Sequence, residues 1–212
     1  MLTIGLTGDV GAGKSTLCKS WRQMGAEIID ADTVARSLWF QPAVRKKAEK
    51  RWGENFFDAD EKTLFAKIAD KIFSDDSEYE FAGKLLRAPT MREIKKRLKQ
   101  LSKNEWAVVE IPLLYEGGYE EMFDITVYAA ATLKKRAERN TTRKWTAEEL
   151  KRRQSKLLPR KEKMLKADIV LRNSGTAEQW REKAEKTGRK FAKLAAAQNL
   201  KLEKRKINNV SA

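Results

Sequence analysis

The chain has 212 residues, of which 41% are hydrophobic and 35% are charged, and it contains one cysteine and no histidine. This composition is typical of a folded protein of one domain and argues against a disordered chain. The lack of histidine excludes Ser-His-Asp and Cys-His catalysis and HExxH metal sites. Any general base must therefore be a carboxylate, a lysine or a tyrosine.

The net charge of +15 is concentrated in two segments. Between Ala131 and Lys166 there are fourteen Lys or Arg residues and four Glu, and between Trp180 and Lys206 there are ten basic and three acidic residues. Such runs are usually solvated helix faces, which is our expectation for the tail after residue 176. A nucleic-acid surface, or a site that neutralises several phosphates, would also need this charge.

Three sequence features predict a cytoplasmic protein without a membrane partner. No apolar run approaches the roughly 18 residues that span a bilayer. The N-terminus lacks the basic segment of a secretion signal. The single cysteine, Cys18, excludes an internal disulfide and suits a reducing compartment. Because Cys18 shares an apolar helix face with its neighbours, we expect it in the core rather than in catalysis.

Short apolar runs, separated by charge-rich helical segments, predict five strands at residues 2–7, 27–30, 106–111, 123–129 and 167–171. Strands that alternate with helices favour a parallel sheet, and continuous apolar runs favour strands covered on both faces. The first helix should begin at Gly13 or Lys14 and end near Gly25, because apolar residues recur there with helical spacing.

Two long segments without strands predict helical inserts in this sheet. About seventy residues follow Asp32 with helical patterns only, which is too long for a simple crossover, and we place this insert at about 36–99. A second, very basic insert lies between the fourth and fifth strands, at about 131–166. The core of a single domain then comprises about 1–35, 100–130 and 167–212.

The segment GDVGAGKS follows the first strand directly and matches the phosphate-loop pattern GxxxxGK[ST] in full. Its glycines let successive backbone N–H groups point at phosphate oxygens, and the helix N-terminus adds a positive potential. Lys14 should reach the β- and γ-phosphates of a nucleoside triphosphate, and Ser15 should bind Mg²⁺. The predicted nucleotide-binding residues are Gly8, Asp9, Val10, Gly11, Ala12, Gly13, Lys14, Ser15 and Thr16.

A second Mg²⁺ ligand is expected at the end of a neighbouring strand, and Glu110, which ends WAVVE, is the candidate. A strand-edge residue or a salt bridge is the alternative for this glutamate. The chain has no NKxD or DxxG motif of a GTPase and is too short for a motor ATPase. These features favour an α/β, three-layer P-loop fold with a five-stranded parallel sheet, a helical acceptor-binding insert and a helical lid, acting as a kinase.

Five stretches in order resemble the dephospho-coenzyme A kinase family. They are LTGDVGAGKST, IIDADTVAR, FDADEKTLFAKIADKIF, EIPLLYEGG and LKADIVLRNSG, and they span about residues 2 to 175. The resemblance implies transfer of the γ-phosphate of ATP to the ribose 3′-hydroxyl of dephospho-coenzyme A, the last step of coenzyme A synthesis. It implies ATP and Mg²⁺ as cofactors and does not lead us to expect nucleic acid as a partner; the oligomeric state is left open.

The resemblance also implies roles for single residues. Asp32 matches the acidic residue that faces the acceptor hydroxyl, although an aspartate there is also a favoured helix N-cap. Asp30 would orient its neighbours or bind Mg²⁺ through water, or simply mark a strand end. Asn173 matches a residue near the adenine, or alternatively favours the turn beside Gly175. The expected acceptor-binding residues are Thr7, Asp32, Arg36, Pro112 and Leu113.

The basic insert should neutralise the phosphates of both substrates. By position, Arg139 and Arg143 match the lid arginines of the family, the first with a catalytic role and the second at the nucleotide, and Arg136 competes for either role. The chain departs from the family pattern at Ala88, where a histidine is common, and at Leu157, where a glutamine is frequent. It also has Asp9 in place of a glycine, whose side chain should turn away from the phosphates or contact the acceptor.

Two other functions remain as alternatives. One is a P-loop kinase for another nucleoside, nucleotide or small metabolite, which Ala88 keeps open. The other is an NTP-dependent nucleic-acid-binding protein, which the basic tail suggests. Against it, the aromatic residues are not interleaved with a compact basic patch; they are Trp39, Phe40, Trp52, Phe56 and Phe57.

Overall fold

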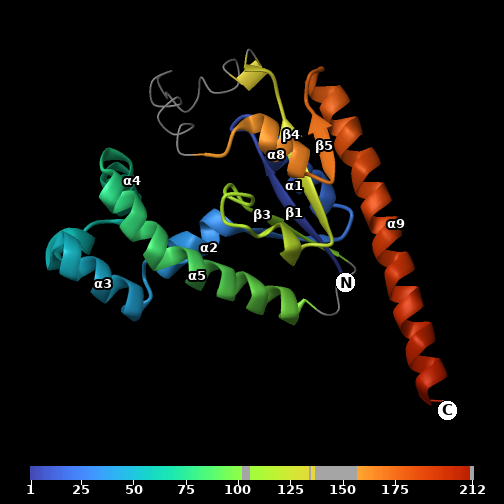
Figure 1. Cartoon of the computed structure of the whole chain (residues 1–212), viewed down its shortest axis with the longest axis horizontal. Helices are drawn as coiled ribbons and strands as arrows, with labels where there is room; N and C mark the ends of the chain where they lie inside the picture. Colours follow the sequence, from blue (N-terminus) through green and yellow to red (C-terminus); the bar gives the residue numbers. More distant parts are fainter. Residues whose placement is uncertain (102–105, 134, 137–156, 211–212) are drawn as a thin grey trace. The chain divides into compact units, whose positions relative to one another are not determined.

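The structure, a computed structural model, describes residues 1–101, 106–133, 135–136 and 157–210. These residues divide into two compact units, one made of Met1–Asp30 with Leu98–Ala212 and the other of Ala31–Arg97. The first unit carries the sheet, and the second is helical (Figure 1).

Five parallel strands form the sheet, as the sequence predicts, and the structure places them in the order β2-β3-β1-β4-β5. Each lies within about two residues of its predicted range, and the buried strands β1 and β3 are apolar because both faces are covered. The bounds are β1 Leu2–Gly8, β2 Ala26–Asp30, β3 Trp106–Glu110, β4 Ile125–Ala130 and β5 Ile169–Arg172.

The parallel register brings the carboxyl ends of the strands to one edge of the sheet. Asp30 at the end of β2 is paired with Glu110 at the end of β3, and Gly8 at the end of β1 is paired with Ala129 of β4. Ligands of open α/β sheets bind at this edge. The register therefore places the phosphate loop and Glu110 at the same end of adjacent strands.

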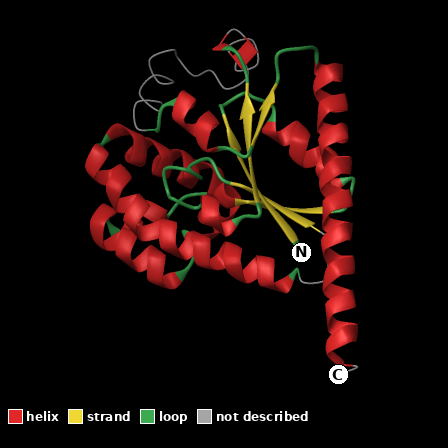
Figure 2. Cartoon of the chain, turned by 45° about the vertical axis from the view of Figure 1, so that its right-hand side comes forward, coloured by secondary structure: helices red, strands yellow, loops and turns green. Residues whose placement is uncertain are grey.

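Helices α1 (Lys14–Arg22) and α9 (Ala177–Val210) pack against one face of the sheet (Figure 2). Their contact is aromatic: the Trp21 and Phe191 rings lie 5.4 Å apart, and Trp106 of β3 joins them. The indole N–H of Trp21 donates to the Ala184 carbonyl at 2.8 Å, so the buried ring keeps a hydrogen bond. The basic tail thus forms one long helix whose inner face belongs to the core.

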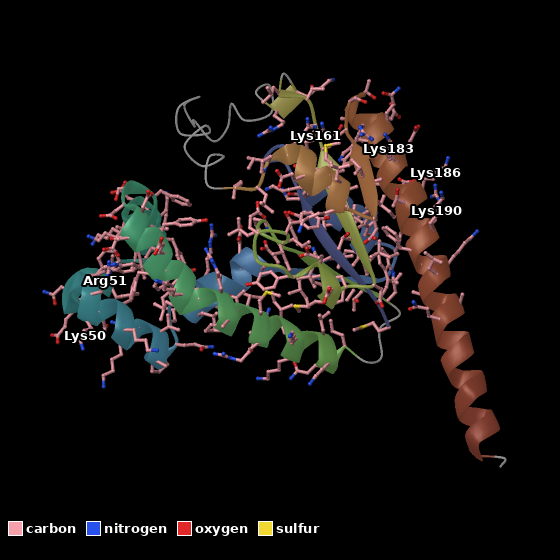
Figure 3. The ribbon with its side chains drawn as sticks, viewed as in Figure 1. Lys50, Arg51, Lys161, Lys183, Lys186 and Lys190 are labelled. Atoms are coloured by element: carbon pink, nitrogen blue, oxygen red, sulfur yellow. The ribbon has the colours of Figure 1, made fainter. Side chains whose placement is uncertain are left out.

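The outer face of α9 is the solvated face expected from the charge pattern. Lys183, Lys186 and Lys190 of this helix, labelled in Figure 3, are exposed, and Lys183 donates from Nζ to the Arg172 carbonyl at the end of β5 at 2.8 Å. Among the helices of the described ranges, none combines the length and hydrophobicity that crossing a bilayer requires.

The second unit consists of helices, as predicted for the first insert, and has a core of its own. Trp39, Trp52 and Phe57 pack together, with the Trp39 and Trp52 rings 5.2 Å apart, and the Phe56 ring lies 4.8 Å from the Trp52 ring at a tilt of 48°. Except for Phe40, which is 48% exposed, the aromatic residues considered for nucleic acid therefore pack with this core. The elements are α2 Ala31–Leu38, α3 Pro42–Trp52, η1 Glu54–Phe57, α4 Glu61–Ser74 and α5 Asp76–Gln100, whose end continues into the first unit.

Two predicted helical segments, 78–87 and 91–101, form the single helix α5, which runs through Pro89. A proline inside a helix removes one hydrogen bond, and the helix here continues past it. The departure at Ala88 therefore lies in the middle of a helix rather than in a turn. Of the predicted lid at 131–166, the structure describes the start and the helix α8 (Arg160–Lys166).

Candidate functional site

The phosphate loop joins β1 to α1 and turns on glycines with positive φ. Gly8, Gly11 and Gly13 have φ of 146°, 77° and 92°, conformations that residues with a side chain rarely adopt. Gly13 is the N-cap of α1, so the helix N-terminus opens directly from the loop. The N–H of Asp9 donates to the Ala129 carbonyl at 3.0 Å, which ties the loop to β4.

Lys14, the phosphate-loop lysine, lies over its own loop. Its Nζ donates to the carbonyls of Gly8 and Asp9 at 3.2 and 3.4 Å and lies 3.9 Å from Glu110 Oε1. These bonds are long, so a phosphate oxygen can replace them at little cost. Ser15, the next residue, is exposed, and it lines with Lys14 the cavity that is described below.

Two side chains support the loop from the side of the core. Asn173 is buried, and its Nδ2 donates to the Ala12 carbonyl at 2.9 Å. Trp180 of α9 donates its indole N–H to the Gly13 carbonyl at 3.1 Å. An added Cβ at Gly13 would lie 2.6 Å from the Trp180 nitrogen, so only glycine fits there. Asn173, expected near the adenine or in a turn, thus holds the loop itself.

Glu110 ends β3 at the mouth of the loop, where it faces both Lys14 and Cys18. The salt bridge considered as an alternative is present, since Lys14 Nζ lies 3.9 Å away. The Cys18 thiol donates to Glu110 Oε2 at 3.4 Å. Burial, and then the charge of Glu110, raise the pKa of Cys18, so it stays a thiol and keeps this bond. Cys18 is buried, as expected.

The loop lines a cavity of about 740 Å³ with the ends of β3 and β4 and the start of α8. This volume lies in the range of small-molecule sites. The cavity is lined by most of the predicted nucleotide residues, by the predicted Mg²⁺ ligand Glu110 and by two predicted acceptor residues: Gly8, Asp9, Val10, Gly11, Gly13, Lys14, Ser15, Glu110, Pro112 and Leu113. Ala12, Thr16, Thr7 and Asn173 are not among the residues that line it.

The sequence assigns no role to the other lining residues, although it makes Arg136 a candidate lid arginine and Leu157 a departure from the family pattern. These lining residues are Tyr128, Leu133, Arg136, Leu157, Leu158, Pro159, Arg160 and Lys163. Apart from Tyr128, which lies in β4, their one sequence signal is the basic composition of 131–166, which does not say which cations face a ligand. Lys163 is buried and forms an ion pair with Glu116 at 2.5 Å, and Glu116 also accepts from the Leu158 N–H. The pair fixes the start of α8 to the loop that follows β3.

The Asp9 side chain turns away from the loop and into a buried cluster. Of the two expectations for this residue, the structure thus agrees with the one in which its side chain turns away from the phosphates. Its Oδ1 accepts from the Tyr128 hydroxyl at 2.7 Å, and its Oδ2 accepts from the Ala131 N–H at 3.1 Å and from Arg160 Nε at 2.9 Å. Burial, and next the Asp9 hydrogen bond, raise the pKa of Tyr128, which therefore remains a donor.

Thr7 and Pro112, both expected at the acceptor, contact each other. The Thr7 hydroxyl donates to the Pro112 carbonyl at 3.1 Å, and Thr7 is buried. This bond connects the end of β1 with the segment after β3. Leu113 follows directly and lines the cavity.

Asp32 and Arg36 belong to the second unit, on helix α2, which begins at Ala31 directly after β2. Asp32 lies in the first turn of this helix, two residues beyond the N-cap position, so it is not the N-cap that the sequence offered as an alternative. Arg36 follows at i+4, on the same helix face, and both are exposed. The guanidinium of Arg36 lies 5.5 Å from the Phe65 ring. Arg139 and Arg143, the predicted lid arginines, lie outside the described residues.

Comparison with known proteins gives one consistent result. A protein-family model for dephospho-CoA kinase matches residues 2–179. A dephospho-CoA kinase of Aquifex aeolicus is 34% identical over 182 residues, which cover 84% of this chain and 92% of that protein. A Thermus thermophilus crystal structure has a TM-score of 0.66 at 30% identity and covers 88% of this chain and 95% of that one. The Campylobacter jejuni dephospho-CoA kinase has the same TM-score at 20% identity, over 90% and 97% of the two chains, and shows the shared fold.

Proposed function

The chain belongs to the dephospho-CoA kinase family, and from this premise we propose which of its residues perform the reaction. The enzyme is a kinase that transfers phosphate from ATP to dephospho-CoA, giving coenzyme A and ADP. One observation supports the assignment of residues most strongly: the phosphate loop, Lys14, Ser15 and Glu110 line a single cavity with the cations Arg136, Arg160 and Lys163.

In this proposal the loop binds the triphosphate of ATP. The N-terminus of α1 supplies N–H groups and a positive potential, and Lys14 exchanges its bonds to the Gly8 and Asp9 carbonyls for phosphate oxygens. Phosphoryl transfer passes through a loose transition state, so the enzyme acts mainly by positioning and by stabilising charge on the transferred group. Arg136 lines the cavity and adds positive charge, and we propose the same for Arg139 and Arg143, with Asn173 holding the loop in shape.

The donor set also suits Mg²⁺. Ser15 offers a hydroxyl and Glu110 a carboxylate, both in the cavity, and Mg²⁺ usually needs only one or two such protein ligands beside substrate phosphates. When bound, Mg²⁺ would neutralise charge on the phosphates. Asp30, paired with Glu110 across the strands, would orient this shell through water.

On the acceptor side we propose that Asp32 accepts the hydrogen of the ribose 3′-hydroxyl and directs that oxygen at the γ-phosphorus. An exposed carboxylate in the first turn of α2 suits this role, and its DAD-x-x-AR context matches the family element. Arg36, one turn further on the same face, would bind a phosphate of the acceptor. Pro112 and Leu113 would contact the acceptor beside the loop, while Thr7 holds Pro112 in place. We further propose a cytoplasmic location, which a single buried thiol suits.

An acceptor panel tests the proposal. The full chain is incubated with ATP and Mg²⁺ and with dephospho-CoA, a nucleoside or a nucleotide, and ADP release is measured with and without a chelator. We expect release with dephospho-CoA, and loss of release when the chelator removes Mg²⁺. Turnover with the nucleoside or nucleotide but not with dephospho-CoA would overturn the acceptor roles, and turnover that the chelator leaves unchanged would overturn the Mg²⁺ site.

A further inference from the structure

The Asp9 carboxylate is the centre of a cluster that the reaction described above does not use. Its side chain is 6% exposed, although it belongs to a loop that binds anions. A negative charge in this place would weaken phosphate binding unless nearby cations offset it, and a buried charge without a partner is strongly unfavourable. The cluster around Asp9 therefore calls for a functional explanation.

Two arginines from different parts of the sequence converge on this carboxylate. Arg160, the first residue of α8, donates from Nε to Asp9 Oδ2 at 2.9 Å and from Nη2 to the Ala131 carbonyl at 3.2 Å. Arg136, which follows β4, donates from Nε to the Val10 carbonyl at 2.9 Å, and its Nη1 lies 3.9 Å from Asp9 Oδ1. Arg136 is buried, whereas the Arg160 side chain is 46% exposed.

Both arginines line the cavity that contains Lys14. A guanidinium has five N–H donors in a rigid plane, and the hydrogen bonds named above use one donor of Arg136 and two of Arg160. The remaining donors suit phosphate oxygens. Because an arginine side chain loses considerable rotamer entropy when it is held in place, a carboxylate that fixes it beforehand lowers the cost of binding an anion.

We propose that Asp9 is a positioning residue for ATP: it fixes Arg136 and Arg160 beside the phosphate loop so that their remaining donors meet the triphosphate. The proposal rests on the proposed binding of ATP in this cavity. In this proposal the aspartate increases the affinity for ATP, because its one buried negative charge holds two positively charged guanidinium groups in position. It also assigns Arg160, which the sequence did not single out, to the nucleotide rather than to the acceptor.

The test measures Asp9→Asn, Arg160→Gln and the double variant by ATP titration calorimetry and by steady-state kinetics. Each single variant should weaken ATP binding about tenfold, since each removes charge-assisted contacts. The KM for dephospho-CoA should stay within about twofold of the starting protein. The double variant should be little weaker than either single one, because Asp9 acts through the arginine.

Asp168→Asn is the matched control. Asp168 also accepts two hydrogen bonds in this sheet unit, from the N–H and hydroxyl of Thr126 at 2.7 and 2.6 Å, but it does not line the cavity. This variant should lower the melting temperature and leave ATP affinity unchanged.

The proposal is overturned if Arg160→Gln binds ATP as the starting protein does, or if Asp9→Asn lowers only the melting temperature, as a purely structural residue would. Effects of the two changes that simply add would also contradict it. The exposed Arg160 provides this test even where Asp9→Asn fails to fold. Calorimetry measures ATP binding without an acceptor. A failure of turnover with dephospho-CoA would therefore count against the proposed function, and it would not change the test of the role of Asp9 in ATP binding.

Discussion

The phosphate loop and helix α2 provide the nucleotide side and the acceptor side of the proposed reaction, and they hold their functional groups in different ways. In the loop, Asp9 and Lys14 are bonded to neighbouring backbone and side chains, and glycines fix the turn. On α2, Asp32 and Arg36 are exposed, and only the opposite helix face is buried, through Ala31, Val34 and Leu38.

From this difference we infer how the phosphate loop and helix α2 would each bind their substrate. A triphosphate has a constant shape and charge, so the loop can be built in advance around it, and prearranged donors avoid a reorganisation cost. The acceptor side instead presents two charged groups on a helix whose own core lies elsewhere. Changes in the loop should therefore affect both structure and nucleotide binding, whereas changes on α2 should affect catalysis alone.

The largest effect is expected for Lys14→Ala. Loss of the cation at the β- and γ-phosphates should lower kcat/KM at least about 100-fold, as removal of one transition-state donor does in other enzymes. Steady-state kinetics measures it, and Lys19→Ala, an exposed lysine of the same helix, is the control that should keep full activity. A Lys14→Ala enzyme within a few-fold of the starting activity would refute the assigned role.

Asp32→Asn should come next, with kcat lowered about 100-fold and the KM for ATP nearly unchanged, because the neutral amide cannot take up the proton and its oxygen is a weaker hydrogen-bond acceptor than a carboxylate. Asp58→Asn, another exposed aspartate of the second unit, serves as the control. If Asp32→Asn changed only the KM for ATP, this result would contradict the assignment of the phosphate loop to the nucleotide and of helix α2 to the acceptor.

Two glycines with similar φ but different surroundings test how much the close packing around the phosphate loop adds to the cost of backbone strain. Gly13 and Gly25 have φ of 92° and 87°, yet an added Cβ meets Trp180 and Asn173 at Gly13 and nothing within 4 Å at Gly25. Gly25→Ala should cost about 1 kcal/mol of unfolding free energy from backbone strain, and Gly13→Ala about 3 kcal/mol. Urea unfolding followed by tryptophan fluorescence measures both, and equal costs would contradict the close packing at Gly13.

The smallest effect is expected in the second unit, at Glu78. The Arg51 hydrogen bond, and next that of Trp52 Nε1 at 2.7 Å, lower the pKa of this carboxyl. Its ionised form thus stabilises the fold above the ordinary glutamate pKa, and this stabilisation disappears as the pH falls through the lowered value. Glu78→Gln should lower the melting temperature by about 2 °C at pH 7 and by less near pH 3. If the difference in melting temperature between Glu78→Gln and the starting protein instead grew as the pH falls, this pH dependence would have the opposite sign and would contradict the prediction.

Sequence reasoning predicts the loop well because its constraints are local. The glycines of GDVGAGKS, the lysine and the helix start are all within eight residues, and the strands follow from apolar runs. Contacts between distant segments were not predictable: Arg160 and Tyr128 reach Asp9 across 151 and 119 residues. The position of Asn173 behind Ala12 is another such contact. The acceptor assignment came from resemblance, because an exposed Asp32 has no local pattern that distinguishes it from a helix cap.

The most direct measurement of the central claim identifies the product. The full chain is incubated with ATP, Mg²⁺ and dephospho-CoA, and ³¹P NMR follows the phosphorus signals. The account predicts one new phosphomonoester on the ribose 3′-hydroxyl for each ADP formed, and almost none with Asp32→Asn. ADP that forms with inorganic phosphate in place of this ester, or the ester formed equally well by Asp32→Asn, would contradict it.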